Sequence, residues 1–428
     1  MKVIIPRICV FLVLTFLVSC VQEPEVFRTN KSDYDHFLVS GPLKTIPANL
    51  QFEVEANSDS MQLPGLWNLT DDNMQIFRET GDVKFLKNSE RTLKKAVELA
   101  TTEKSGFIRA LSRNYMLQHR FKEALLLAEE ARALGTDVEA TQSLLFDLHM
   151  ELGNYGLANK YLDSIKDVSS YEYLVRLARW NNFKGHSDSA IKLMEKATEK
   201  AEISQNEDLL LCSYVNLADY YGATGHIEEA YKLYLKALQI SPQDANAKKG
   251  IAWIVYSYER NGMEALRILD SITQKNKSPE YYLLKAEIAA FIDDDMLRVQ
   301  ALDDYYKMAG KNTDYGDMYN AYNVDFLLSM DVEQRAYELA QEEVSIRPTP
   351  ESYGWLAYSL LHLGEKEKSM KVIEEHVIGV THEPAILQRA AEIYKANGKQ
   401  DKVKALKEEL MGATYELGPI KEAEVASL

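Results

Sequence analysis

Apolar side chains recur at helical spacing along most of this chain, and residues 211–244 show the pattern most clearly. A first apolar stripe is spaced like one face of an α-helix and consists of Tyr214, Leu217, Ala218 and Tyr221. A second stripe consists of Ala230, Leu233, Tyr234, Ala237 and Leu238. Gly225 separates the stripes and Pro242 ends the second, because glycine suits a helix C-terminus and proline cannot continue a helix interior. The pattern predicts two antiparallel helices that approach closely at Ala218 and Ala230.

The same period recurs on both sides of this stretch, over about residues 77–411. About ten extra residues at 199–208 predict a longer helix or a bulging loop, and one residue is inserted near Asn261 and Gly262. Residues 279–316 are helical in pattern but keep the alanine spacing poorly. The period therefore predicts an all-α chain of about nine to ten helix pairs with an irregular stretch at 279–316.

The stretch at 211–244 resembles the tetratricopeptide repeat (TPR), whose pattern it matches at Tyr214, Leu217, Ala218, Tyr221, Gly225, Ala230, Tyr234, Ala237 and Pro242. The resemblance implies a TPR-type α-α superhelical solenoid in which the first helix of each pair lines a concave groove. It also implies that side chains in this groove bind a peptide or protein partner. These are Arg109, Arg113, Asp147, Arg179, Asp219, Trp253, Tyr256, Asp325 and Tyr358.

Trp253 and Tyr256 are the strongest single candidates within this set, because an exposed aromatic ring with a polar group makes a good binding anchor. The alternative is that both rings pack on a neighbouring helix or on the N-terminal segment. Arg109, Arg113 and Arg179 supply cations in an otherwise acidic chain. They suit a carboxylate or an acidic segment of a partner.

Residues 1–19 have the features of a targeting segment: Lys2 and Arg7 precede an apolar run that is too short to span a membrane. The segment ends in Leu17, Val18, Ser19 and Cys20. This ending resembles the bacterial lipobox, which implies cleavage before Cys20 and lipidation of its thiol; the alternative is an ordinary secretory signal. Gln22, Glu23 and Glu25 resemble the export signal of Bacteroidota lipoproteins, or form a plain tether. We expect an outer-membrane lipoprotein of the bacterial envelope that faces the periplasm or the cell surface.

The sequence thus divides into a signal peptide (1–19), a tether with an irregular segment (20–75), a TPR solenoid (76–411) and a C-terminal tail (412–428). Turn residues punctuate the second part, and alternation at 50–55 is compatible with a short strand. The tail lacks the helical period, so we expect it to be frayed or to form a cap. The whole chain is similar to extracytoplasmic TPR lipoproteins of Bacteroidota.

Charge and motif content exclude several classes of function. A formal net charge of −16 argues against a nucleic-acid partner. The sequence contains no nucleophile elbow, phosphate-binding glycine loop or His-Glu-x-x-His helix. His376 and His382 lack a specified third metal ligand, and the aspartates at 293–295 lack the other features of a calcium loop. We expect no enzymatic activity, no cofactor and no bound metal.

These observations predict a lipid-anchored interaction scaffold that binds a peptide or protein in its groove. Two alternatives remain open. One is a factor for the assembly or transport of an outer-membrane client, and the other is an accessory subunit of an enzyme complex. The identity of crosslinked partners separates them.

Overall fold

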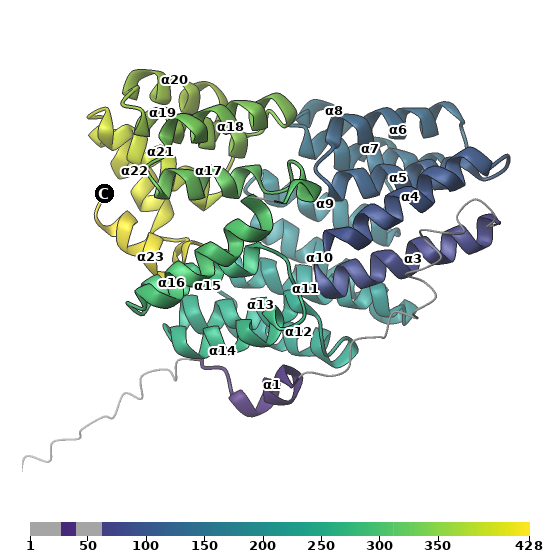
Figure 1. Ribbon diagram of the computed structural model, residues 1–428, viewed down its shortest axis with the longest axis horizontal. Helices are drawn as coiled ribbons and strands as arrows, with labels where there is room; N and C mark the ends of the chain where they lie inside the picture. The colour runs from purple at the N-terminus through teal and green to yellow at the C-terminus, as the bar shows by residue number, and fades with distance from the viewer. Residues whose placement is uncertain (1–26, 40–61, 311) are drawn as a thin grey trace, which may run out of the picture.

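The computed structural model describes residues 27–39, 62–310 and 312–428, and every regular element in these ranges is a helix (Figure 1). The helices pair into antiparallel hairpins that stack side by side. The first pairs are α3 (Leu63–Thr80) with α4 (Val83–Leu99), α5 (Lys104–Leu117) with α6 (Phe121–Ala133), α7 (Val138–Glu151) with α8 (Tyr155–Ser164), α9 (Tyr171–Phe183) with α10 (Ser187–Ser204), and α11 (Glu207–Ala223) with α12 (Ile227–Ile240). The predicted all-α solenoid is confirmed.

The second half continues in the same way. Its elements are α13 (Ala245–Trp253) and its π-helical extension η1 (Ile254–Tyr258) with α14 (Gly262–Thr273), α15 (Glu280–Phe291) with α16 (Asp295–Tyr305) and its extension η2 (Tyr306–Gly310), the short η3 (Thr313–Tyr315), α17 (Asn320–Ser329) with α18 (Glu333–Ile346), α19 (Pro350–His362) with α20 (Lys366–His376), α21 (Pro384–Ala396) with α22 (Gln400–Leu410), and finally α23 (Thr414–Ala426). The irregular stretch at 279–316 therefore keeps the hairpin arrangement in α15 and α16.

In the hairpin at 211–244, small residues lie at the contact between the two helices and a glycine lies in the turn, as the sequence predicts. Ala218 and Ala230 have no exposed surface, and the two helices pack closely there. Gly225 adopts φ +81° in the turn between them, a conformation that glycine takes without strain. The extra residues at 199–208 lengthen α10 and extend the start of α11.

Helical structure begins earlier than the expected boundary at residue 76. α3 starts at Leu63 with Pro64 in its first turn, where a proline needs no backbone hydrogen bond. Leu66 and Leu69 are buried, which explains why this helix forms outside the recognisable period. The turn residues near 64 mark a helix start rather than an irregular segment. The possible strand at 50–55, the leader and Cys20 lie outside the described residues.

A π-helical turn accounts for the inserted residue of the sixth hairpin. The sequence predicted the insertion near Asn261, but the extra residue is accommodated in η1, at the end of the first helix of the pair. A π turn takes up one residue without breaking the helix and rotates the side chains that follow it. Tyr256, one of the expected binding residues, lies within this turn.

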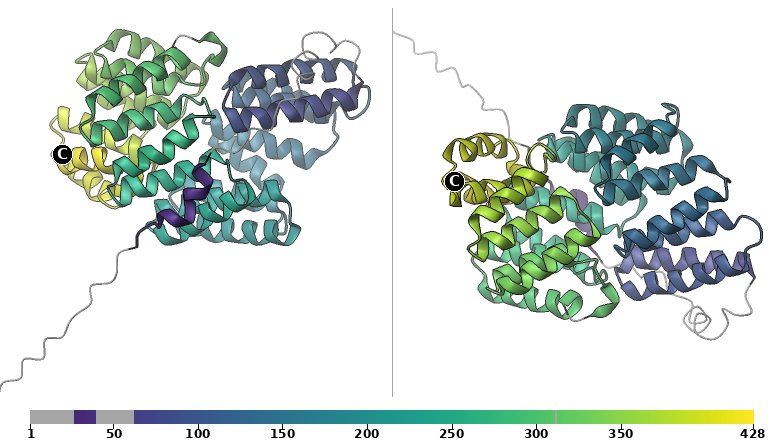
Figure 2. Two further views of the ribbon diagram at one scale, coloured as in Figure 1. Left: turned by 60° about the horizontal axis from the view of Figure 1, so that its bottom comes forward. Right: turned by 90° about the horizontal axis from the view of Figure 1, so that it is seen from above.

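The stacked hairpins curl until distant parts of the chain touch (Figure 2). The turn between α3 and α4 contacts the link before α15, where the backbone N–H of Lys277 donates to Thr80 O at 2.6 Å. Further along, Arg347 after α18 contacts Glu151 at the end of α7, with Nη2 and Oε2 3.1 Å apart. Two arms, α3–α9 and α15–α22, therefore face each other across α10–α14.

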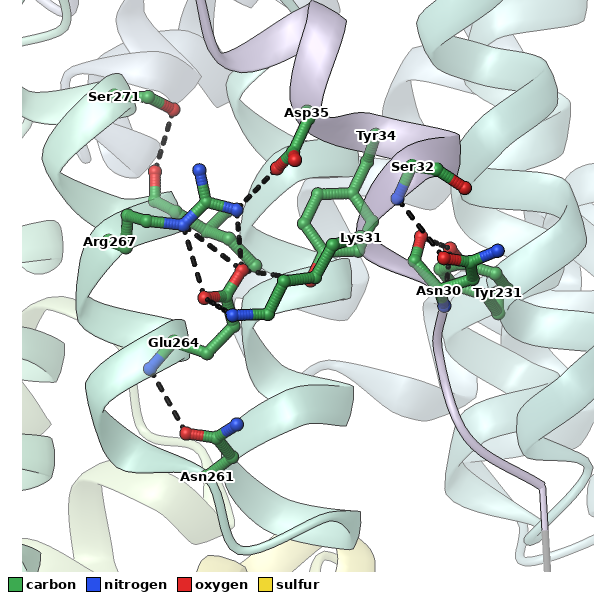
Figure 3. A network of polar contacts seen from close by, with 11 residues as sticks. Asn30, Lys31, Ser32, Tyr34, Asp35, Tyr231, Asn261, Glu264, Arg267 and Ser271 are labelled. Atoms are coloured by element: carbon green, nitrogen blue, oxygen red, sulfur yellow. Dashed lines mark hydrogen bonds and ion pairs between the residues drawn. The ribbon is translucent and has the colours of Figure 1, made fainter.

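A short N-terminal helix, α1 (Lys31–Leu38), docks on α12 and α14 (Figures 1 and 3). Tyr34 is 1% exposed, and its hydroxyl donates to Oε1 of Glu264 at 3.0 Å. Lys31 and Arg267 also bind this carboxylate, each at 2.6 Å. Although burial opposes ionisation, these three hydrogen bonds lower the pKa of Glu264. The segment before the solenoid is thus tied to its middle.

The C-terminal segment forms a kinked helix that packs inside the solenoid. α23 contains Gly418 at φ +75° followed by Pro419, and it packs on α11, η1, α15 and α21. Leu417 and Val425 are buried. Of the two possibilities for the tail, fraying is therefore excluded and a packed segment is observed.

Candidate binding surface on the inner face

The first helices of the hairpins form the inner face of the curl, and the N-terminal part of this face is rich in arginine. Arg109 on α5 is only 7% exposed. It donates to Oγ of Ser105 at 3.1 Å and to Oγ1 of Thr141 at 3.3 Å, and it forms an ion pair with Asp137. These bonds already engage the guanidinium of Arg109, an expected binding residue, so it offers little exposed surface to a partner.

The neighbouring helices bring the other N-terminal candidates together. Arg179 on α9 binds Glu151 at 2.6 Å and lies 3.8 Å from Asp147, so these two expected binding residues lie together. Arg176, which the sequence reasoning missed, also binds Asp147 at 2.7 Å. Its position three residues before Arg179 was the available signal, because residues at that spacing share one helix face. Arg113 is exposed and makes no hydrogen bond or ion pair with the residues that the structure describes.

The middle of the inner face is covered by the chain's own C-terminal segment. Trp253 donates from Nε1 to the backbone oxygen of Tyr415 at 3.0 Å, and Ser257 donates to the same oxygen at 2.6 Å. Tyr256 has no exposed surface and donates its hydroxyl to Glu287 at 3.0 Å. The expected exposed anchors are thus packing residues here, as the alternative interpretation of the sequence held. The physical reason is the π turn together with the docking of α23.

Carboxylates dominate the inner face from α11 onward. Asp219 accepts a hydrogen bond from the hydroxyl of Tyr234 at 2.5 Å, and burial raises its pKa. Tyr358 donates to Glu392 at 2.8 Å, and burial raises the pKa of Glu392 as well. Asp325 is exposed and has no hydrogen bond or ion pair within the described ranges. The sequence placed these groups on the inner face, but it did not identify Tyr234 and Glu392 as the partners of Asp219 and Tyr358.

A pocket of about 490 Å³ lies where the two arms meet. It is built from the ends of α7 and α9, the starts of α8 and α10, the links before α19 and α21, and α23. Its charged lining residues are Glu151, Arg179, Arg347, Glu351, Glu383, Arg389 and Glu416, and its rings are Tyr155, Phe183 and His382. Its volume lies within the range of about 300–1,000 Å³ that is typical of ligand sites. Of the expected binding residues only Arg179 lines it, because the pocket depends on contacts between distant repeats.

Gly185 permits the close approach of the two arms at this pocket. A Cβ atom at Gly185 would lie 2.8 Å from the ring of His382. On the other side, Arg347 joins Glu151 of the N-terminal arm to Glu351 of α19, at 3.1 and 3.5 Å. The pocket walls are therefore held by specific contacts.

Two further properties bear on the class of protein. No three metal-ligating side chains converge within the ranges that the structure describes. None of the helices in those ranges has the length and apolar character that a bilayer crossing requires.

Comparison with known families gives one sequence match, at the hairpin that also shows the clearest pattern. The family model for the tetratricopeptide repeat matches residues 213–244, which cover most of α11 and all of α12. This stretch is a tetratricopeptide repeat. The stacked hairpins on both sides of it make the chain a TPR solenoid. No curated protein matches the sequence.

Several solved structures share helical architecture with this TPR solenoid at low identity. That of pilF from Pseudomonas aeruginosa is 13% identical and covers 49% of this chain and 94% of its own, with a TM-score of 0.37. Yeast Tom70 is 15% identical and covers 85% and 88%, with a TM-score of 0.35. A tetratricopeptide repeat protein from Parabacteroides merdae ATCC 43184 is 16% identical and covers 60% and 98%, with a TM-score of 0.34. Likenesses at this level carry no information about partner or activity.

Proposed function

We propose that this TPR solenoid is a lipid-anchored, non-enzymatic scaffold of the bacterial cell envelope. It holds a peptide or protein partner on its inner face, at the pocket between the two arms. The observation that carries the proposal is the pocket itself: charged side chains from separate repeats line it, and several of them lack a partner. A packed helical repeat has no structural need for such a site, because unpaired charges in a cleft weaken folding.

The docked N-terminal helix supports an anchored arrangement. Phe27 lies seven positions after Cys20 in the sequence, and an extended chain of that length spans at most about 25 Å. Phe27 packs on Tyr231 of α12, with ring centroids 5.6 Å apart. A lipid on Cys20 would therefore keep the face formed by α12 and α14 close to the outer membrane, because α1 attaches the N-terminal segment to the middle of the solenoid.

Lipidation is tested by the fate of Cys20. Expressed with its leader, the wild-type chain should partition into the detergent phase, because an acyl chain binds apolar assemblies. Cys20→Ala should remain unprocessed or become water-soluble. Equal mature mass and equal partition of the two proteins would refute the lipid anchor and leave the partner site to be judged separately.

Partner binding is tested by crosslinking in cells. A photoreactive amino acid at Phe183, which lines the pocket, should give discrete adducts. The matched control is the same amino acid at Leu126, a 73% exposed residue on α6. Adducts that are absent at 183, or identical at both positions, would contradict the proposal. An outer-membrane client among the adducts would favour an assembly or transport factor instead, and an enzyme would favour the role of an accessory subunit.

A further inference from the structure

Arg389 is a buried cation whose nearest carboxylates lie beyond ion-pair distance among the described residues. It lies on α21 and is 7% exposed, and its guanidinium stacks on the ring of Trp355 at 3.7 Å. It makes no ion pair with any residue that the structure describes, and its Nε atom is buried without a hydrogen-bond partner. Desolvation accordingly lowers the pKa of Arg389. Stacking satisfies the flat face of a guanidinium but not its edge, where the N–H groups point.

The other two arginines of the pocket, Arg179 and Arg347, form ion pairs with carboxylates. Arg179 is neutralised by Glu151, and Arg347 is neutralised by Glu151 and Glu351. These pairs hold the two arms together. They leave Arg389 as the pocket's unmatched positive charge among the described residues.

Two carboxylates of the same pocket are also unmatched. Glu383 at the start of α21 and Glu416 on α23 line it, and neither forms an ion pair within the described part of the chain. Glu383 does not cap its own helix with its side chain either. The surrounding protein raises the pKa of Glu416 to about 7, and the nearby charge of Glu383 adds to this effect. A cation placed between the two carboxyl groups would relieve their repulsion.

The pocket therefore presents an unpaired guanidinium and a pair of unpaired carboxyl groups, which call for a ligand that carries both charges. We propose that the pocket binds a short zwitterionic peptide, with its free α-carboxylate on Arg389 and its free ammonium between Glu383 and Glu416. The planar guanidinium edge matches a carboxylate with two parallel hydrogen bonds. Tyr155 and Phe183, whose ring centroids are 4.2 Å apart, form an aromatic wall for the peptide's side chains. This inference rests on the proposed partner-binding function and specifies the ligand's chemistry.

Blocked peptides test both charges on the full-length chain. Isothermal titration with triglycine should show binding, and N-acetyl-triglycine and triglycine amide should each bind at least about tenfold more weakly. Triglycine blocked at both ends should give no heat. No heat with triglycine up to about 10 mM, or equal binding of the doubly blocked peptide, would overturn the proposal. Free glycine that binds as tightly as triglycine would overturn the assignment to a peptide.

Variants assign each end of the ligand to its residues. In Arg389→Gln, triglycine amide should bind as well as triglycine, while N-acetyl-triglycine should still bind more weakly. In Glu416→Gln, N-acetyl-triglycine should bind as well as triglycine, while triglycine amide should still bind more weakly. Arg335→Gln is the matched control, because Arg335 is exposed on α18 and pairs with Glu338 away from the pocket. Circular dichroism checks folding, and Glu416→Gln alone suffices if the Arg389 variant does not fold. Unchanged penalties in that folded variant would refute the site.

The two proposals can fail separately. Peptide binding without crosslinks at position 183 would leave the peptide site standing and remove the protein partner. Crosslinks at 183 in a chain that binds no peptide would keep the scaffold function and remove this ligand.

Discussion

Glu343 shows how burial of a single carboxyl group can make the stability of this solenoid depend on pH. The side chain is 2% exposed on α18, accepts a hydrogen bond from Asn320 at 3.2 Å and lies 3.6 Å from Arg347. Burial raises its pKa from 4.5 to about 7, against the opposing effects of Arg347 and Asn320. Glu351 and Asp317 add to the rise. The folded chain therefore holds this proton more tightly than the unfolded chain does.

This difference has a defined sign. The contribution of Glu343 to stability is fully present below pH 4.5 and is lost as the pH rises toward about 7. Glu343→Gln should therefore be more stable than wild type at pH 8 by roughly 1–3 kcal/mol, with little difference at pH 4.5. Urea unfolding at both pH values measures this. Glu365→Gln, an exposed control, should follow wild type, and a Glu343→Gln curve parallel to wild type would contradict the assignment.

At the scale of elements, the turn between α7 and α8 is shaped by a partner far away in the sequence. Gly153 and Gly398 occupy equivalent turns within their hairpins and share φ +69°. A Cβ atom at Gly153 would lie 2.4 Å from the backbone oxygen of Pro348, whereas nothing lies within 4 Å of the same position at Gly398. The two glycines thus have the same local conformation and differ in a contact between the arms.

Alanine at these two positions separates conformation from contact. Gly398→Ala should lose roughly 1–2 kcal/mol, the typical cost of a left-handed conformation for a residue with a side chain. Gly153→Ala should lose at least about 1 kcal/mol more, because the link at 347–349 must also move. Urea denaturation followed by circular dichroism measures both values. Equal losses in the two variants would mean that the arms do not touch in solution.

At the scale of the whole molecule, α23 turns a potential groove into a packed interior. It connects the last hairpin to the first helices of the middle repeats. The backbone oxygen of Tyr415 on α23 accepts hydrogen bonds from Trp253 and Ser257, and Glu422 on α23 forms an ion pair with Arg260. It also contributes Glu416 to the pocket between the arms. The segment therefore completes the inner face.

Removal of α23 tests this role. A chain that ends at Met411 should unfold at a temperature at least several degrees lower and should bind a dye for apolar surface, because the faces of η1 and α21 become exposed. The fluorescence emission of Trp253 should shift to longer wavelength. Trp253→Phe in the full-length chain and in the truncated chain separates the emission of Trp253 from that of the other tryptophans. A frayed tail would leave melting temperature, dye binding and emission unchanged.

The sequence by itself determined the local units of this protein. The 3.6-residue period, the small residues at Ala218 and Ala230 and the glycine at Gly225 specify helices, hairpins and turns, because these depend on neighbours close in the chain. The placement of Asp147 and Arg179 on adjacent first helices followed from the same repeat, but the contact between their side chains came from the structure. The start of α3 escaped this reasoning, since its helix lies outside the repeat pattern.

Only the tertiary structure decided which inner-face residues remain available to a partner. A helical pattern shows that Trp253 and Tyr256 face inward, but not that a segment more than 150 residues later covers Trp253 or that α15 packs on Tyr256. It likewise cannot place Arg389 and Glu416 in one pocket with Arg179, because that meeting depends on how far the stacked hairpins curl. Small rotations between successive repeats add up along the solenoid, so the contacts between its arms belong to the whole chain and not to any repeat.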